Sequence, residues 1–527
     1  MRQLAVVRQQ EGTRGISIES PDRHHARRVG HEVDYRRPTL RVVRRRDHTG
    51  RLVKEHVVQG LRLDVLPVYL DDVVGPDDRV ELARHTVHMH TPFTNQLVRT
   101  PSRRDSRASE KRIQPHSTMI ARLMCSLMSR IDELTDKLAE LAVFGANVQP
   151  GQLVAVTSSI GKEQLTRKIA SAAYRRGAKY VDVLYFDQWI KRERIALADA
   201  ASLDYIPPWM SQRLLYFSDE HAARISLSGP HAPRALEGLD PARAGRDLLP
   251  YLPETGEVVN RMTTSWCIVP APTRSWANVV YPELSSDEAY EALWEAVAHI
   301  CRLEADDPAQ AWMERCATLK ANADRLTGRR FDALRLHGPG TDLTIGLLPS
   351  AHWAAGDLVT VDGRRHSPNI PTEEVFTTPD PERVDGHVTA TMPLELSGSV
   401  ISGIRVEFEG GRAVKIDADQ GADALRAVAS RDDGARRLGE VALVDNQGRI
   451  GPLETVFLDT LIDENAATHI ALGNGYDHPV EDPADKARIN KSLVHVDFMI
   501  GSPEIAVDAI DRDGAVTPVL RGGTWQL

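Results

Sequence analysis

The stretch Glu464-Asn-Ala-Ala-Thr-His469-Ile-Ala-Leu-Gly-Asn-Gly-Tyr476 lies near the C-terminal end of a chain of 527 residues. It holds a carboxylate, an imidazole and a phenol among small and apolar residues. We expect a helix over residues 463–472, ended by Gly473, after which the two glycines allow the sharp turn that returns Tyr476. Glu464 and His469 are five residues apart and do not quite share a helix face, so one of them is expected at a helix end. A core or capping histidine and a tyrosine that only packs remain alternatives.

A second cluster, His495-Val-Asp497, follows in the strand-like run 493–499. Residues two apart on a strand point to the same side, so the imidazole and the carboxylate should lie together within an apolar segment. An unpaired charge there would be costly, which leaves two explanations: a structural ion pair or a pair of metal ligands.

Two acidic positions stand upstream. Glu373 and Glu374 are adjacent, so on an extended chain at most one of them points straight at a given ion. Glu440 begins the apolar run Glu-Val-Ala-Leu-Val, where a solvated position is the alternative. Several carboxylates with two imidazoles suit a pair of divalent ions, with a preference for zinc, cobalt or manganese over magnesium or calcium.

Length and composition set the broad class. A chain of this length predicts two or three domains, and 42% apolar residues suffice for packed cores. No apolar run of eighteen residues and no secretory signal are evident, and the four cysteines show no CxxC pairing. We therefore expect a cytoplasmic protein without a disulfide framework or a thiolate zinc site.

The net charge of −9 hides an asymmetry. Residues 1–117 carry 23 Lys and Arg against 15 Asp and Glu, whereas the remainder carries 42 against 59. An arginine-rich arm can bind nucleic acid, but this one has no recognisable motif, so nucleic acid is not the expected partner. A disordered extension and an incorrectly assigned start, with Met119, Met124 or Met128 as the true one, are the alternatives.

After the arm, the chain shows two successive patterns of predicted secondary structure. Residues 153–157, 162–176 and 180–186 predict a strand, a helix and a strand, which is a βαβ unit with parallel pairing. Its loop 158–161 has one glycine and lacks a nucleotide-binding pattern. Residues 285–288 predict a capping box, and Asp307-Pro308 another helix start. From Phe331 onward, short alternating strands and turns predict an α+β domain that holds every candidate ligand. The expected domains are an α/β domain over 118–330 and a metal-binding domain over 331–527.

Three segments resemble one known family. Residues 369–377, 463–473 and 493–502 are similar to motifs of the aminopeptidase T family, the thermophilic-type leucyl metallo-aminopeptidases that include aminopeptidases S and II. Residues 340–347 and 440–444 fit the same pattern. The resemblance covers roughly residues 128–527 and leaves 1–117 unmatched. His366 departs from the pattern, because an apolar or aromatic residue is expected there, and this bears on substrate preference.

The resemblance implies a two-domain homodimer with an enclosed cavity and two metal ions per chain, zinc, cobalt, manganese or magnesium. The implied metal ligands are Glu374, Glu440, Glu464, His469, His495 and Asp497. Glu440 would bridge the ions and Tyr476 would stand beside them as a catalytic phenol. The implied activity is release of N-terminal, leucine-like residues from peptides that have a free amino terminus.

The expected chemistry follows from these groups. Two ions about 4 Å apart can activate a water molecule and polarise the scissile carbonyl. Tyr476 can donate a hydrogen bond to the developing oxyanion, and Glu373 is the expected carrier of the water proton to the leaving amine. A non-catalytic metal-binding homologue and another dinuclear hydrolase, such as a phosphoesterase, are the alternatives.

Overall fold

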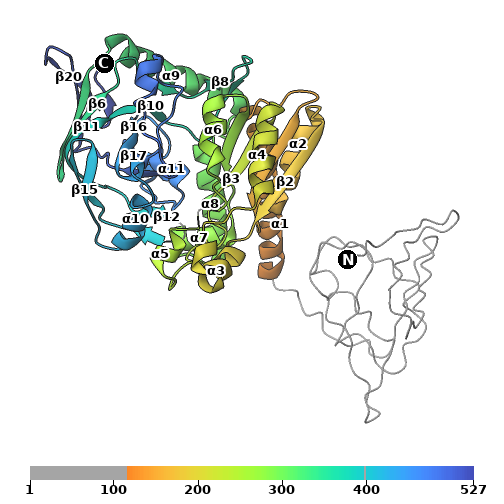
Figure 1. The fold of residues 1–527 in the computed structure, drawn as a ribbon. Coiled ribbons are helices and arrows are strands. Elements are labelled where there is room, and N and C mark those ends of the chain that lie inside the picture. Colours follow the sequence, from red (N-terminus) through yellow and green to blue (C-terminus); the bar gives the residue numbers. More distant parts are fainter. Residues whose placement is uncertain (1–114, 248, 397–398) are drawn as a thin grey trace, which may run out of the picture. The chain divides into compact units, whose positions relative to one another are not determined.

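The computed structural model describes residues 115–247, 249–396 and 399–527. They form an N-terminal α/β domain with a parallel sheet and a C-terminal domain of antiparallel sheets (Figure 1). Nearly all of the arm predicted over residues 1–117 lies outside the described residues, so its interpretation stays a prediction. Within the described part of the chain, no helix is at once long and apolar enough to cross a bilayer.

The sheet of the N-terminal domain has four parallel strands in the order β2-β1-β3-β4. The strands are β1 (Leu153–Ser159), β2 (Tyr180–Phe186), β3 (Ala223–Ser228) and β4 (Ser265–Pro270). The predicted βαβ unit is confirmed, since β1 and β2 pair in parallel and α2 (Glu163–Arg175) connects them. A crossover of this kind is what parallel pairing requires.

The described part of the N-terminal domain contains nine α-helices. They are α1 (Pro115–Gly145), α2, α3 (Gln188–Leu197), α4 (Pro208–Asp219), α5 (Pro241–Ala244), α6 (Glu254–Arg261), α7 (Arg274–Val280), α8 (Ser286–Ile300) and α9 (Pro308–Arg329). Apolar side chains of α1, α2 and α8, including Leu138, Ile169 and Leu293, pack with the inward side chains of β1, β3 and β4. The predicted capping box opens α8, with Ser285 and Glu288 bonded reciprocally, and Pro308 starts α9.

Antiparallel pairing dominates the C-terminal domain. An eight-stranded sheet has the order β15 (Arg412–Asp417), β14 (Arg405–Glu409), β11 (Pro379–Thr389), β6 (Thr341–Leu347), β5 (Ala333–Gly338), β19 (Ala506–Ile510), β20 (Val516–Arg521), β21 (Thr524–Trp525). A five-stranded sheet has the order β18 (His495–Met499), β17 (His469–Gly473), β16 (Leu438–Val444), β10 (Glu374–Thr377), β7 (Ala354–Ala355). The remaining elements are the pairs β8 (Leu358–Val359) with β9 (Arg365–His366) and β12 (Leu394–Leu396) with β13 (Ser399–Ile401), and helices α10 (Ala422–Ala429), α11 (Thr460–Glu464) and α12 (Pro483–Lys486).

The helix predicted over residues 463–472 is wrong. Helix α11 ends at Glu464, and the chain re-enters the five-stranded sheet as β17, which begins at His469. Strand β17 is buried along its whole length because β16 and β18 flank it, so its sequence lacks the apolar–polar alternation of a half-exposed strand. Gly473 therefore ends a strand. The expectation that either Glu464 or His469 stands at a helix end is met by Glu464, the last residue of α11.

The segment before β10 joins the two domains. Its residues 368–370 lie along the edge of β4: the Ile268 amide donates to the Pro368 carbonyl at 2.8 Å, and the Ile370 amide donates to the Ile268 carbonyl at 2.9 Å. A few residues after this contact with the parallel sheet, the chain reaches Glu374, the first residue of β10.

Candidate metal centre

Strand register brings five of the predicted residues to one face of the five-stranded sheet. Glu440 pairs with Ala471, which pairs with Asp497, so the two carboxylates face the same side. His469 and His495 are two residues from members of this row and share its face. Glu374 pairs with Val444, four residues beyond Glu440, and joins them from β10.

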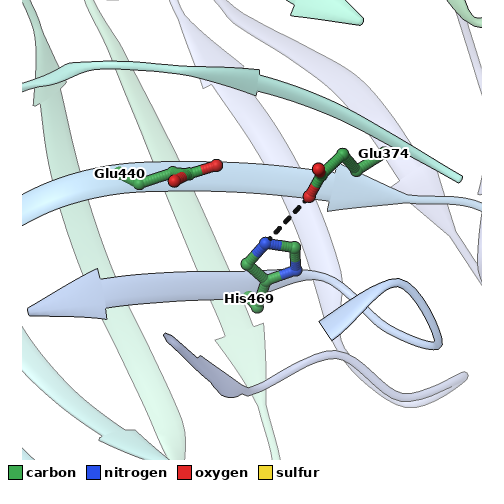
Figure 2. Close-up of side chains that lie close together, drawn as sticks. All are labelled: Glu374, Glu440 and His469. Carbon is green, nitrogen blue, oxygen red and sulfur yellow. Dashed lines mark ion pairs between the residues drawn. The ribbon is translucent and has the colours of Figure 1, made fainter. Parts of the chain in front are cut away.

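Ligand atoms from this face form two groups that share one residue. Glu374, Glu440 and His469 make the first group, and Glu440, His495 and Asp497 the second; within each, the ligand atoms lie within 4.8 Å of one another. Figure 2 shows the first group, with a dashed line from the His469 ring to the Glu374 carboxylate, whose Nε2 and Oε2 are 3.0 Å apart. In the second, His495 Nε2 lies 3.1 Å from Glu440 Oε2 and 3.4 Å from Asp497 Oδ1.

Both histidines are oriented through their other ring nitrogen. His469 Nδ1 lies 3.1 Å from the carbonyl oxygen of Ala467, and His495 Nδ1 lies 2.7 Å from the carbonyl oxygen of Asn474. A carbonyl can only accept, so each Nδ1 carries the proton and donates it. This tautomer leaves Nε2 directed at the carboxylates, which is the arrangement of metal-binding histidines.

Glu464 reaches the same centre from the end of α11. It lines the same cavity as the two groups but belongs to neither of them. Burial raises its pKa well above the ordinary value, and the nearby charges of Asp497 and Glu374 add to the rise. Burial also raises the pKa of Glu440, to about 7, although the hydrogen bond from His495 opposes the change.

Burial has the opposite effect on the pKa values of the imidazoles, but the neighbouring carboxylates outweigh it. Burial alone would lower the pKa of His469, but the hydrogen bond and charge of Glu374 outweigh it and raise that pKa to about 10. The pKa of His495 is raised well above its ordinary value against the effect of burial, by the charge and hydrogen bond of Asp497 and by the hydrogen bond of Glu440. This group of four carboxylates, three of them buried, thus favours positive charge on its neighbours, as a cation site must.

Tyr476 lies beside the second group. Its hydroxyl is 3.4 Å from His495 Nε2, and the two ring centroids are 5.1 Å apart. The Thr378 hydroxyl donates to the Tyr476 carbonyl at 2.8 Å, and the next amide, that of Asp477, donates to Asn260 Oδ1 on α6 at 3.0 Å. Burial raises the pKa of the phenol, which therefore stays protonated as a hydrogen-bond donor.

Glu373 is the one predicted site residue that the structure turns away from the centre. Its carboxylate is fully buried between Arg302, whose Nη2 donates at 2.9 Å, and Arg315, whose Nε also donates to it. It does not line the metal cavity. The prediction that Glu373 carries a proton to the leaving amine is therefore wrong, because both carboxylate oxygens are engaged by guanidinium groups.

A cavity of about 340 Å³ surrounds the centre. Its other walls are mainly apolar, and none of the described residues that line it is Lys or Arg.

Sequence reasoning missed His478, which lines the cavity with its ring centroid 5.5 Å from that of Tyr476 and 5.7 Å from that of Phe376. The signal that could have found it is its spacing, two residues after Tyr476. His366, which departs from the family pattern, does not line this cavity. Its ring packs at a tilt against that of Trp266, which does line the cavity, with ring centroids 4.4 Å apart.

Comparison with known proteins agrees with this centre. The family described as thermophilic metalloprotease (M29) matches residues 131–525. The chain belongs to this family. Aminopeptidase T of Thermus aquaticus is 42% identical over 410 residues, which cover 76% of this chain and 100% of that protein. Aminopeptidase T of Thermus thermophilus is 44% identical over 400 residues, covering 74% of this chain and 98% of that protein.

A solved structure, wild-type AmpT from Thermus thermophilus, matches with a TM-score of 0.68 at 42% identity, covering 75% of this chain and 99% of that one. The predicted membership of the aminopeptidase T family is confirmed. So is the prediction of a metal-dependent enzyme that hydrolyses peptide bonds.

Proposed function

We propose that this enzyme releases N-terminal amino acids from peptides at a centre of two divalent metal ions. The observation that carries the proposal is the sharing of Glu440 by two groups of ligand atoms. Glu374 and His469 would hold one ion, His495 and Asp497 the other, and the Glu440 carboxylate would bridge them. Glu464 would complete the ligand set from the same cavity.

The charge of the site favours two ions over one. Three buried carboxylates and the partly buried Glu464 face a cavity whose described lining offers no Lys or Arg, and the two imidazoles are neutral when they bind metal through Nε2. One divalent cation would neutralise half of the four negative charges, whereas two neutralise all of them. Mixed imidazole and carboxylate donors suit zinc, cobalt or manganese, and magnesium remains a candidate.

The bound ions would supply an activated water molecule and polarise the scissile carbonyl. The protein supplies the remaining functions. Tyr476, kept protonated by burial, is placed to donate a hydrogen bond to the carbonyl oxygen as negative charge develops. Trp266, Ile268 and Phe376 offer an apolar wall to the side chain of the N-terminal residue, which supports a leucine-like preference.

Two alternatives are less well supported. A dinuclear phosphoesterase would need cationic groups for its substrate, and the described cavity lining contains neither Lys nor Arg. A non-catalytic homologue would have no use for a phenol placed beside the ligand groups, whereas Tyr476 is fixed there by Thr378.

The test is turnover of a panel of aminoacyl-p-nitroanilides by metal-stripped protein, with zinc, cobalt, manganese or magnesium restored in turn. We expect no activity without metal and the highest restored activity on the leucyl substrate. Activity that survives complete metal removal would contradict the proposal. N-acetylated leucyl peptides should resist cleavage, because anchoring of the substrate requires a free amine; comparable cleavage of blocked peptides would rule out this anchoring.

The bridging role is tested by Glu440→Gln, which removes one charge and nearly keeps the shape of the side chain. Loss of a shared carboxylate should weaken both sites, so metal analysis should find well under two ions per chain and activity should largely disappear. The matched control is Glu407→Gln. Glu407 lies on β14 and forms an exposed ion pair with Lys415 on β15, so this variant should keep two ions. Two ions retained in Glu440→Gln would assign the bridge to another residue.

We further propose a cytoplasmic homodimer. This assembly is supported by the resemblance to the aminopeptidase T family, and light scattering of the purified enzyme tests it directly. A monomer at micromolar concentration would contradict it, and cell fractionation tests the compartment.

A further inference from the structure

One face of the parallel sheet leads from the metal cavity to a second cavity. Trp266 and Ile268, on β4, line the metal cavity. In the parallel register their neighbours on β3 are Arg224 and Ser226, which line the second cavity and face the same side. Adjacent strands lie about 4.8 Å apart, so one strand spacing separates the wall of the metal cavity from Arg224.

The second cavity, of about 260 Å³, lies under α4 and the segment that leads into α6. Helices α4 and α6 are side by side over this face of the sheet (Figure 1). Thr255, on α6, lines both cavities. Tyr251, in the segment that leads into α6, also lines the second cavity. The two cavities are therefore neighbours with a common wall.

Arg224 is a cation without a counter-ion among the described residues. Its guanidinium makes no hydrogen bond or ion pair with any of them, and it lines a cavity whose walls include Trp209 and Phe217. Burial lowers the pKa of Arg224 to about 10, and the charge of Arg213 adds to the decrease. Arg213, by contrast, is paired with Asp182 and lies over the Phe217 ring at 5.0 Å.

The guanidinium of Arg224 is partly exposed in this cavity and has no counter-ion among the described residues, so it is available to an anion that enters the cavity. Arginine presents parallel N–H donors that match the two oxygens of a carboxylate. The second cavity thus has the charge, the donors and the position for an acidic group that belongs to a substrate held in the first.

We propose that Arg224 binds a carboxylate of the peptide substrate on the C-terminal side of the scissile bond. This inference rests on the proposed function, because it requires the N-terminal residue of the peptide to lie at the metal centre. An extended peptide advances about 3.3 Å per residue, so a chain that crosses β4 reaches β3 within a few residues. The carboxylate is either the terminus of a short peptide or the side chain of a downstream Asp or Glu.

The experiment compares matched peptides on the metal-loaded enzyme. Leu-Gly-Gly as the free acid is compared with its C-terminal amide, and the amides of Leu-Gly-Asp and Leu-Gly-Asn form the second pair. We expect kcat/KM to favour the carboxylate member about ten- to hundredfold, mainly through KM, because a hydrogen bond to a charged partner is lost in the other. The pair that shows the difference identifies the source of the carboxylate.

Arg224→Gln should bring this ratio to within about twofold of one, and Arg224→Lys should keep part of it. The ratio is taken within each variant, so changes in folding or metal content cancel. Arg261→Gln is the control, because it removes a positive charge from an exposed position on α6 that lines neither cavity. It should keep the ratio of the unmodified enzyme.

Equal kcat/KM for both members of both pairs would overturn the inference, as would an unchanged ratio in Arg224→Gln. Leucyl-p-nitroanilide, which has no carboxylate, separates this failure from failure of the proposed function. If it is cleaved while the peptide ratio is absent, only the role of Arg224 fails. If no leucyl substrate is cleaved, both proposals fall.

Discussion

Hydrogen bonds to the carbonyl of Tyr476 and from the next amide hold the backbone of Tyr476 in place, so these contacts do not occupy its hydroxyl. The Thr378 hydroxyl holds its carbonyl, Asn260 holds the following amide, and the phenol lies 3.4 Å from His495 Nε2. A donor that acts on the oxyanion contributes more in the transition state than in substrate binding, and losing one typically costs ~10²–10³ in turnover.

Tyr476→Phe should therefore keep its metal content and a near-native KM while kcat falls by roughly that factor. Steady-state kinetics on leucyl-p-nitroanilide, together with metal analysis, check this. A kcat within a few-fold of the unmodified enzyme would mean that Tyr476 only packs against Phe376 and His478.

Glu373 provides the contrasting residue, since it differs from Glu374 by one position and faces the opposite way. Its carboxylate pairs with the buried guanidinium groups of Arg302 and Arg315. Arg315 also pairs with Asp445, so Glu373→Gln leaves Arg302 without a carboxylate partner among the described residues. Breaking such a buried pair typically costs about 3–5 kcal/mol of stability. We expect a clearly lower free energy of unfolding in urea with metal content unchanged.

The control for Glu373→Gln is Glu304→Gln, which breaks a partly exposed ion pair with Arg449. Surface pairs contribute little, so its stability should stay close to that of the unmodified enzyme. A Glu373→Gln variant that is as stable as this control but inactive would contradict the structural role and would indicate that Glu373 takes part in catalysis.

At the scale of elements, the centre depends on how closely β16 approaches the turn after β17. A Cβ at Gly439 would overlap the carbonyl group of Asn474, and this same carbonyl accepts the Nδ1 proton of His495. The absence of a side chain at Gly439 thus permits the contact that fixes the tautomer of a proposed ligand.

Gly439→Ala should displace the Asn474 carbonyl and lower metal affinity about 10–100-fold, the usual effect of losing the partner that orients a ligand. Titration of metal-stripped protein, followed by calorimetry, measures the change. Gly328→Ala is the matched control, because Gly328 lies in α9 with no atom within 4 Å of an added Cβ. Unchanged affinity in Gly439→Ala would show that His495 keeps its orientation without this carbonyl.

At the scale of the whole molecule, the part of the chain that matches the family and the N-terminal arm are distinct in sequence. The family match starts at residue 131, and the charge balance reverses sign near residue 117. A chain that begins at Met119 should therefore be soluble, dimeric and fully active. Light scattering and leucyl-p-nitroanilide turnover, each compared with the full chain, check this prediction. Loss of folding or of activity in the shortened chain would show that the arm is part of the enzyme.

The sequence by itself determined the inventory of the centre and much of the local structure. Alternation placed His495 and Asp497 on one side of a strand, and turn and capping signals located the βαβ unit and α8, because these features depend only on neighbours in the chain. It failed at residues 463–472, where strand β17, enclosed by two other strands, is apolar apart from His469 and shows no helical or strand periodicity.

Only the tertiary structure decided which side chains meet. Nothing local distinguishes Glu373 from Glu374; the difference comes from Arg302 and Arg315, which are 71 and 58 residues away in the chain and bind the carboxylate of Glu373. Sharing of Glu440 by two ligand groups follows from the register of β16 with its neighbours, and the unpaired charge of Arg224 from the cavity that α4 and α6 leave beside β3. Pairing, burial and charge compensation between distant segments are properties of the folded chain, and they turn a list of residues into a site.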